Sequence, residues 1–65
     1  MTLAMADLSG QDGNVFAVVA RAKRALVKAG YRSEADQMVD RVFQADSYDE
    51  ALRIMLEYVE DGAAA

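Results

Sequence analysis

Apolar side chains recur every three or four residues along three segments of the chain, which is the spacing of an amphipathic helix. The first segment follows the turn Asp12-Gly13-Asn14, and its apolar positions are Val15, Val18, Val19, Ala22, Leu26 and Ala29. Asn14 is suited to cap this helix, and Gly30 is suited to end it in a left-handed conformation. We predict a helix over residues 14–29, whose wide apolar arc is typical of a central helix.

Two further stripes predict a second and a third helix. The second covers residues 33–45, with Ser33 as the cap and an apolar stripe of Ala35, Met38, Val39, Val42 and Phe43. The third covers residues 47–61, where Ser47 and Glu50 form a capping box and Gly62 supplies the stop. Its stripe is Tyr48, Ala51, Leu52, Met55, Leu56 and Val59. Connections of a few residues favour antiparallel neighbours.

The N-terminal segment has no helical stripe, and two alternatives remain for it. We predict an all-α fold, a small three-helix bundle over residues 13–62 with an irregular arm over 1–12 and a disordered tail over 63–65. The alternative is an α+β fold, in which residues 2–8 form a short strand paired with a C-terminal strand around residues 57–60.

The length and composition allow one small domain near the lower limit for independent folding. The chain has no cysteine for a disulfide and no histidine, so close helix packing, self-association or a partner must support it. We therefore expect a homo-oligomer. The lack of cysteine fits a cytoplasmic protein, and no apolar run reaches the length of a membrane span or has the form of a signal peptide.

Catalysis is not expected from this set of residues, and we predict no catalytic, metal-binding or cofactor-binding residue. A nucleophile needs an adjacent base, and without histidine or cysteine each serine fits a cap or a turn better. The carboxylate pairs Asp36/Asp40 and Glu57/Asp61 fall on outward faces, where solvation is the expected state. The glycines of segment 7–14 fit a plain turn better than a phosphate or calcium loop.

Charge is sorted along the chain. Residues 1–32 carry five basic and two acidic side chains, whereas residues 33–65 carry two basic and nine acidic ones. The basic face of the first helix presents Arg21, Arg24 and Lys28, which is the best candidate for nucleic-acid contact, although the net charge of −4 disfavours such binding. The acidic candidates for a protein interface are Asp36, Asp40, Asp49, Glu50, Glu57 and Glu60.

Four apolar residues lie at the borders of the predicted apolar arcs. Ile54 and Tyr58 border the arc of the third helix, and Phe16 and Val27 border that of the first. These residues either complete the core of the small bundle or form an exposed patch of the kind that marks a protein interface.

The motifs Asp12-Gly13-Asn14-Val15-Phe16-Ala17, Ala29-Gly30, Ser47-Tyr48-Asp49-Glu50 and Tyr58-Val59-Glu60 together resemble a group of short uncharacterised bacterial and phage proteins. The resemblance spans about residues 12–60 and implies a phage or mobile-element setting, without an activity or site residues. Together with this resemblance, the sequence leads us to expect a non-enzymatic protein-binding module. Its most concrete form is an inhibitor or accessory of a host nucleic-acid machine. Its acidic surface would carry the electrostatics, with Ile54 and Tyr58 as apolar anchors.

Overall fold

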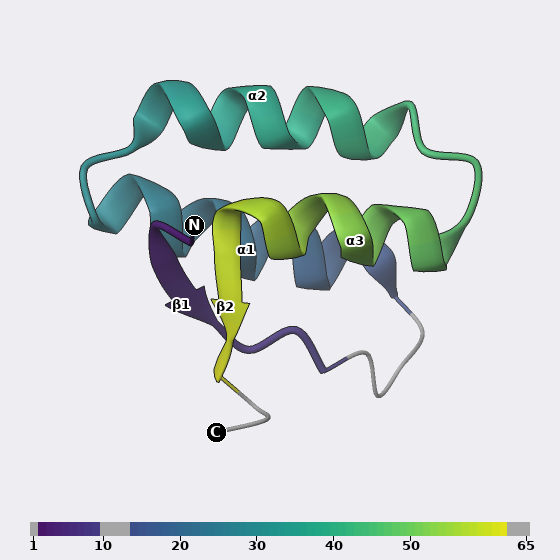
Figure 1. Cartoon of the computed structure of the whole chain (residues 1–65), viewed down its shortest axis with the longest axis horizontal. Coiled ribbons are helices and arrows are strands. Elements are labelled where there is room, and N and C mark those ends of the chain that lie inside the picture. Colours follow the sequence, from purple (N-terminus) through teal and green to yellow (C-terminus); the bar gives the residue numbers. More distant parts are fainter. Residues whose placement is uncertain (1, 10–13, 63–65) are drawn as a thin grey trace.

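The computed structural model describes residues 2–9 and 14–62 and has three helices and two short strands (Figure 1). Their order is β1 (Ala4–Ala6), α1 (Val15–Lys28), α2 (Arg32–Phe43), α3 (Tyr48–Tyr58) and β2 (Val59–Asp61). The predicted three-helix bundle is confirmed, and so is the short pair of terminal strands given as its alternative. The predicted tail over 63–65 and the Asp12-Gly13 part of the first turn lie outside the described residues.

The helix ends follow local capping chemistry. The Asn14 side chain accepts a hydrogen bond from the Phe16 N–H at 3.1 Å and begins α1. Gly30, at φ +93°, ends it, and the Gly30 and Tyr31 N–H groups donate to the carbonyls of Val27 and Leu26. These two hydrogen bonds form a Schellman motif.

The start of α3 matches its predicted cap, whereas that of α2 does not. The Ser47 hydroxyl accepts from the Glu50 N–H at 3.1 Å, and the Glu50 carboxylate accepts from the Asp46 N–H at 2.8 Å. The prediction of Ser33 as a cap is wrong, because α2 already begins at Arg32 after Tyr31, which makes no side-chain cap bond. The Schellman turn ends at Tyr31, and the second helix follows directly.

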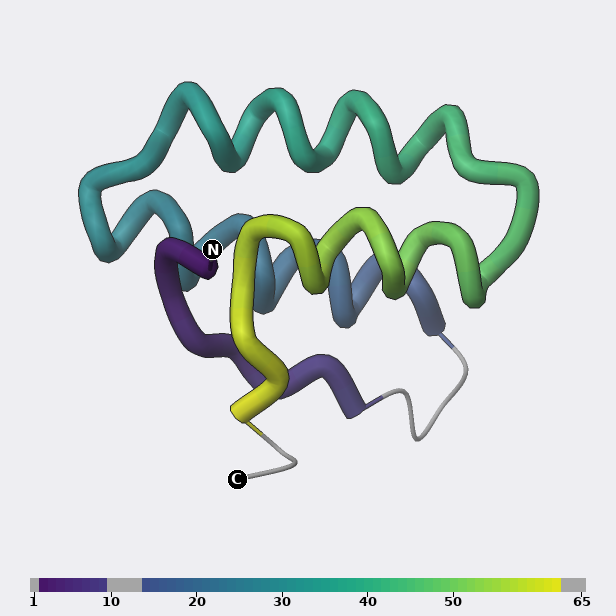
Figure 2. Tube along the Cα trace, in the orientation of Figure 1, coloured from purple at the N-terminus to yellow at the C-terminus, as the bar shows by residue number. Residues whose placement is uncertain are grey.

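The N-terminal arm is not irregular throughout, which corrects the prediction for residues 1–12. Ala4–Ala6 pairs in parallel with Val59–Asp61, and the Leu3 N–H extends the ladder to the Tyr58 carbonyl at 2.8 Å. Parallel strands need a long crossover, and here the whole helical bundle is the crossover. Figure 2 traces the chain from the purple N-terminal strand through the helices to the yellow strand beside it.

The third helix ends at Tyr58 and not at residue 61. Val59 adopts an extended conformation, φ −128° and ψ 154°, and is completely buried, while Glu60 is exposed. This alternation suits a strand, and β1 supplies the hydrogen bonds that a further helical turn would have supplied internally. Tertiary pairing therefore overrides the predicted stop at Gly62.

The core lies between the helices and beneath the small sheet. Its largest fully buried side chains are Leu26, Met38, Met55, Val18 and Val59. The strand β1 contributes Ala6 to the core, and Leu8, two residues further along the chain, is buried in the same cluster. All three helices and both strands thus share one apolar core.

Candidate functional site: an aromatic groove and a cationic hollow

Two phenylalanine rings stand in contact on the surface of the bundle. Phe16, in the first turn of α1, and Phe43, the last residue of α2, have ring centroids 6.0 Å apart at an interplanar angle of 55°. Their exposed fractions are 66% and 63%. Aromatic pairs of this geometry attract each other, but these rings leave most of their area in water. The two rings therefore form an exposed apolar pair on the surface of the bundle.

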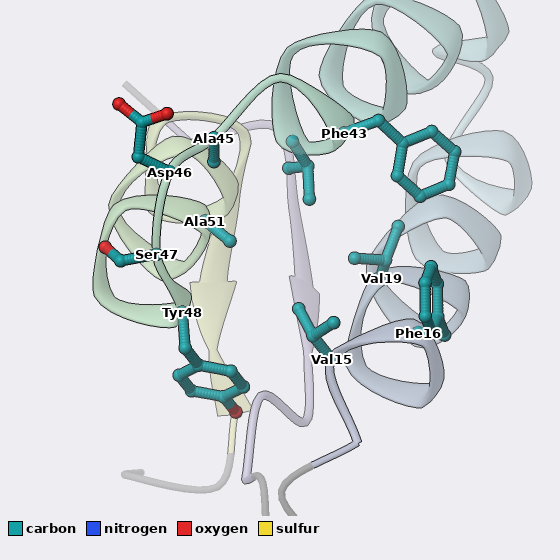
Figure 3. A pocket seen from close by; sticks show the side chains of 10 residues that line it. Val15, Phe16, Val19, Phe43, Ala45, Asp46, Ser47, Tyr48 and Ala51 are labelled. Atoms are coloured by element: carbon teal, nitrogen blue, oxygen red, sulfur yellow. The ribbon is translucent and has the colours of Figure 1, made fainter.

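A groove of about 410 Å³ opens beside this pair (Figure 3). Phe16 and Phe43 stand on one side of it, Ser47 and Tyr48 stand on the other, and Val19 lies between them. Asp46 and Ser47 are the polar members of a lining that is otherwise apolar or aromatic. Small-molecule and peptide sites share this composition, a mostly apolar wall with a few polar groups that orient the ligand. We call this feature the aromatic groove.

Local sequence places the groove at the junction of three helix ends. The cap at Asn14 puts Phe16 at the start of α1, and the C-cap at Gln44 leaves Phe43 at the end of α2. The Ser47 cap then begins α3 after a short connection. Because α1 and α2 are antiparallel across a tight turn, the start of the first helix lies beside the end of the second.

The predicted apolar anchors and the observed exposed ones are different residues. Ile54 and Tyr58 are buried, with 9% and 8% exposed, so they complete the core and do not form a surface patch. Phe43 was expected in the buried stripe of the second helix and is exposed. Phe16 and Val27, the other border residues, do lie on the surface. The sequence did contain a signal for this exposed pair. Phe16 and Phe43 lie at nearly equal distances from the turn at Gly30, so two antiparallel helices bring them side by side.

Arg41 contacts Tyr58 and holds its ring at the edge of the core. The Arg41 guanidinium lies 5.7 Å from the centre of the Tyr58 ring and donates to its hydroxyl at 3.1 Å. The same guanidinium makes a two-bond pair with the Glu57 carboxylate at 2.9 and 3.0 Å. These hydrogen bonds lower the pKa of Glu57 and raise the pKa of Arg41. One predicted interface acid is thereby engaged in an intramolecular ion pair.

Three other predicted interface acids also have intramolecular partners. Asp36 lies 4.0 Å from the Lys23 ammonium, Asp40 accepts from the Gln44 side chain at 3.2 Å, and Glu50 completes its cap. Asp49 and Glu60 are exposed on α3 and β2. Because several of these carboxylates already have intramolecular partners, the acidic surface would attract a basic partner less strongly than its formal charge indicates.

The three residues of the predicted basic face have different environments. Arg21 donates from Nε to the Asp7 carbonyl at 2.8 Å and from a terminal nitrogen to the Ser9 carbonyl at 2.7 Å, so it fastens the segment after β1 to α1. Hydrogen bonds from Ser9, together with the nearby Arg21 charge, lower the pKa of Asp7. Arg24 and Lys28 remain exposed on the helix.

A second hollow, of about 370 Å³, lies along α1 from Ala20 to Val27, beside Arg32 at the start of α2. Its lining consists of two apolar residues, Ala20 and Val27, and three cations, Lys23, Arg24 and Arg32. Val27 is 37% exposed. We call this feature the cationic hollow. Its cations can attract an anionic group or the face of an aromatic ring.

Among residues 2–9 and 14–62, no group of three or more histidine, cysteine, aspartate or glutamate side chains is placed to hold a metal ion. No helix within this part of the chain is both long and apolar enough to cross a membrane. A scan against protein-family models, a search of the curated proteins and a search of the solved structures each find no match to this chain.

Proposed function

We propose that this protein is a non-enzymatic binding module that recognises another polypeptide through the aromatic groove. The observation that carries the proposal is the exposed contact pair Phe16 and Phe43 beside that groove. Aromatic side chains in a desolvated pocket dominate the binding energy of protein interfaces. A chain of this size has little area to stabilise an isolated fold, so leaving two phenylalanines in water favours a binding role for them.

The polar groups of the groove would fix the orientation of a bound partner segment. Asp46 and Ser47 line it at the start of α3, where the Ser47 hydroxyl is already used as a cap. A partner segment with apolar side chains and one basic or amide group would match this lining. From the resemblance we also propose a phage or mobile-element setting, in which the module inhibits or assists a host nucleic-acid machine.

Photo-crosslinking from the groove tests this function directly. A benzophenone amino acid is placed at position 43 in the full chain, inside the cells that make the protein, and a matched variant carries it at Arg53, an exposed position on α3 that does not line the groove. We expect a covalent adduct to a polypeptide from position 43, little from position 53, and a loss of the first when Phe16→Ser is added.

Two outcomes would overturn the proposal. Equal adduct yields from positions 43 and 53 would show that the groove is not preferred. An adduct that nuclease treatment removes would favour the alternative, a nucleic-acid-binding accessory that uses the basic face with Arg24 and Lys28.

A further inference from the structure

The charged residues that line the cationic hollow are all cations. Most of the lining lies on one face of α1, at the helical spacings i, i+3, i+4 and i+7, and consists there of Ala20, Lys23, Arg24 and Val27. Arg32 joins this face from the start of α2. Two helices thus bring three of the seven basic side chains together in a chain whose net charge is −4.

Two of these cations have no structural partner. Among residues 2–9 and 14–62, the side chains of Arg24 and Arg32 make no ion pair and no hydrogen bond, and both are exposed. Arg32 is also the first residue of α2, where the positive end of the helix dipole makes a cation unfavourable. The stability of α2 therefore does not explain a cation at this position, whereas an anion bound in the hollow would.

The third cation, Lys23, is only weakly engaged. Its ammonium lies 4.0 Å from the Asp36 carboxylate, and the two side chains are 46% and 62% exposed. An ion pair that is this long and this exposed contributes little free energy. Asp36 does not line the hollow, although its charge reduces the local positive potential. Lys23 can therefore leave Asp36 for an anion in the hollow at small cost.

The number of cations indicates an anion with more than one charge. A carboxylate carries one negative charge, whereas a phosphate monoester carries about −1.5 to −2 at pH 7 and has three strong acceptor oxygens. A guanidinium binds such a group through two parallel N–H bonds, and an ammonium binds it as a point charge. Two arginines and a lysine therefore match a phosphate monoester better than a carboxylate.

The rest of the hollow indicates an organic group attached to the phosphate. A volume of about 370 Å³ falls in the range of small-molecule sites and is more than a lone phosphate group requires. Val27 is 37% exposed and offers an apolar contact beside the cations. A guanidinium also stacks on the face of a planar ring. A phosphate joined to such a ring would use both the cations and the apolar part of the lining.

We propose that the cationic hollow binds a small phosphorylated molecule with a planar ring, of the mononucleotide class. The three cations neutralise its phosphate, while Val27 and a guanidinium contact its ring. A long nucleic acid is disfavoured because residues 33–65 carry nine acidic and two basic side chains, which repel an extended polyanion. The ligand is therefore compact and bound by local charge.

This site is separate from the aromatic groove. No residue lines both. Figure 1 shows the turn between α1 and α2 at one end of the bundle and the connection between α2 and α3 at the other. Arg32 lies at the first of these connections, whereas Ser47 and Tyr48 of the groove lie at the second. The inference thus goes beyond the proposed function and does not depend on it.

A chemical-shift titration of the isotope-labelled full chain tests the inference. The probes are the four common ribonucleoside monophosphates, each added to about 10 mM, and the comparison compounds are inorganic phosphate, adenosine and oligothymidylate. We expect saturable shifts of the backbone amides around Arg24, Val27 and Arg32 with a nucleotide, at a Kd of about 1 mM or tighter.

Three variants show whether the lining cations carry the binding. Arg24→Met and Arg32→Met should each weaken nucleotide binding roughly tenfold, because each removes a charge-assisted pair of hydrogen bonds to the phosphate. Lys28→Met is the matched control, since Lys28 is an exposed cation of α1 that does not line the hollow. Its loss should weaken binding less than about twofold at physiological salt. The dispersion of amide shifts in the same spectra shows that each variant is folded.

Several outcomes would overturn the inference. The first is the absence of saturable shifts with all four nucleotides. The second is equal weakening by Lys28→Met and the two arginine variants, which would show an effect of net charge alone. The third is inorganic phosphate or adenosine binding as tightly as the nucleotide, because one of the two groups would then contribute nothing. Tighter binding of oligothymidylate than of any mononucleotide would replace this site with a nucleic-acid interface.

Discussion

Arg21 is predicted to be a structural residue, although its position on the basic face makes it look like a nucleic-acid contact. Its guanidinium donates to the carbonyls of Asp7 and Ser9 at 2.8 and 2.7 Å. Among residues 2–9 and 14–62, no other side-chain hydrogen bond joins the segment that follows β1 to α1. Replacing Arg21 by methionine keeps an apolar stem of similar length and removes both hydrogen bonds.

The size of the effect follows from these two bonds. A hydrogen bond to a charged group contributes about 1.5–3 kcal/mol, and partial exposure of this pair reduces each to about 1 kcal/mol. The expected loss is therefore about 2 kcal/mol, against a total stability of about 3–10 kcal/mol for a chain of this size. A change of 1 kcal/mol shifts Tm by about 4–8 °C in a small domain, so Tm should fall by about 10 °C.

The assay is thermal unfolding followed by circular dichroism at low micromolar concentration, with Arg24→Met as the matched control. Arg24 lies one turn further along α1 and is exposed, so its replacement should change Tm by no more than about 2 °C at this concentration. Arg21→Lys should recover only part of the loss, because one ammonium cannot reproduce the forked geometry of the guanidinium. Hydrogen exchange should show faster exchange of the Leu3 N–H in Arg21→Met. Equal Tm values for the Arg21→Met and Arg24→Met variants would refute the reasoning.

Three further predictions concern the core, the ion pair and a turn. Leu26→Ala, at a completely buried position, should cost about 3 kcal/mol or more and leave the chain largely unfolded at 37 °C, as read from urea unfolding; a loss below about 1 kcal/mol would contradict the packing. The lowered pKa of Glu57 means that its ion pair with Arg41 stabilises the fold above the ordinary carboxyl pKa of 4.5 and that this contribution is lost as pH falls through the lower, folded-state value. The Tm difference between wild type and Glu57→Gln should accordingly be present at pH 7 and shrink in acid, and a difference that stays constant with pH would argue against it. Gly30→Ala should cost about 1 kcal/mol because φ is +93° there, although its Cβ would meet no atom, and Gly30→Asn should cost less; unchanged Tm values for both would dispute the strained turn.

The sequence by itself determined the features that depend on residues close together in the chain. Asn14, Ser47 with Glu50, and Gly30 set helix ends through hydrogen bonds or backbone conformations that span only a few residues. Hydrophobic periodicity likewise predicted the three helices and most of their buried faces, because a helix buries one side whatever covers it. The class of fold followed from these local rules.

The tertiary structure decided everything that depends on which distant segments meet. The end of α3 at Tyr58 and the pairing of Ala4–Ala6 with Val59–Asp61 depend on hydrogen bonds between the two ends of the chain. The exposure of Phe43 depends on the position of α1 against the end of α2, and the burial of Tyr58 on packing by neighbouring elements, including Arg41. A border residue of an amphipathic arc is equally suited to core and surface, so only its neighbours settle its role. For that reason the apolar part of the candidate interface became visible only once the helices were packed.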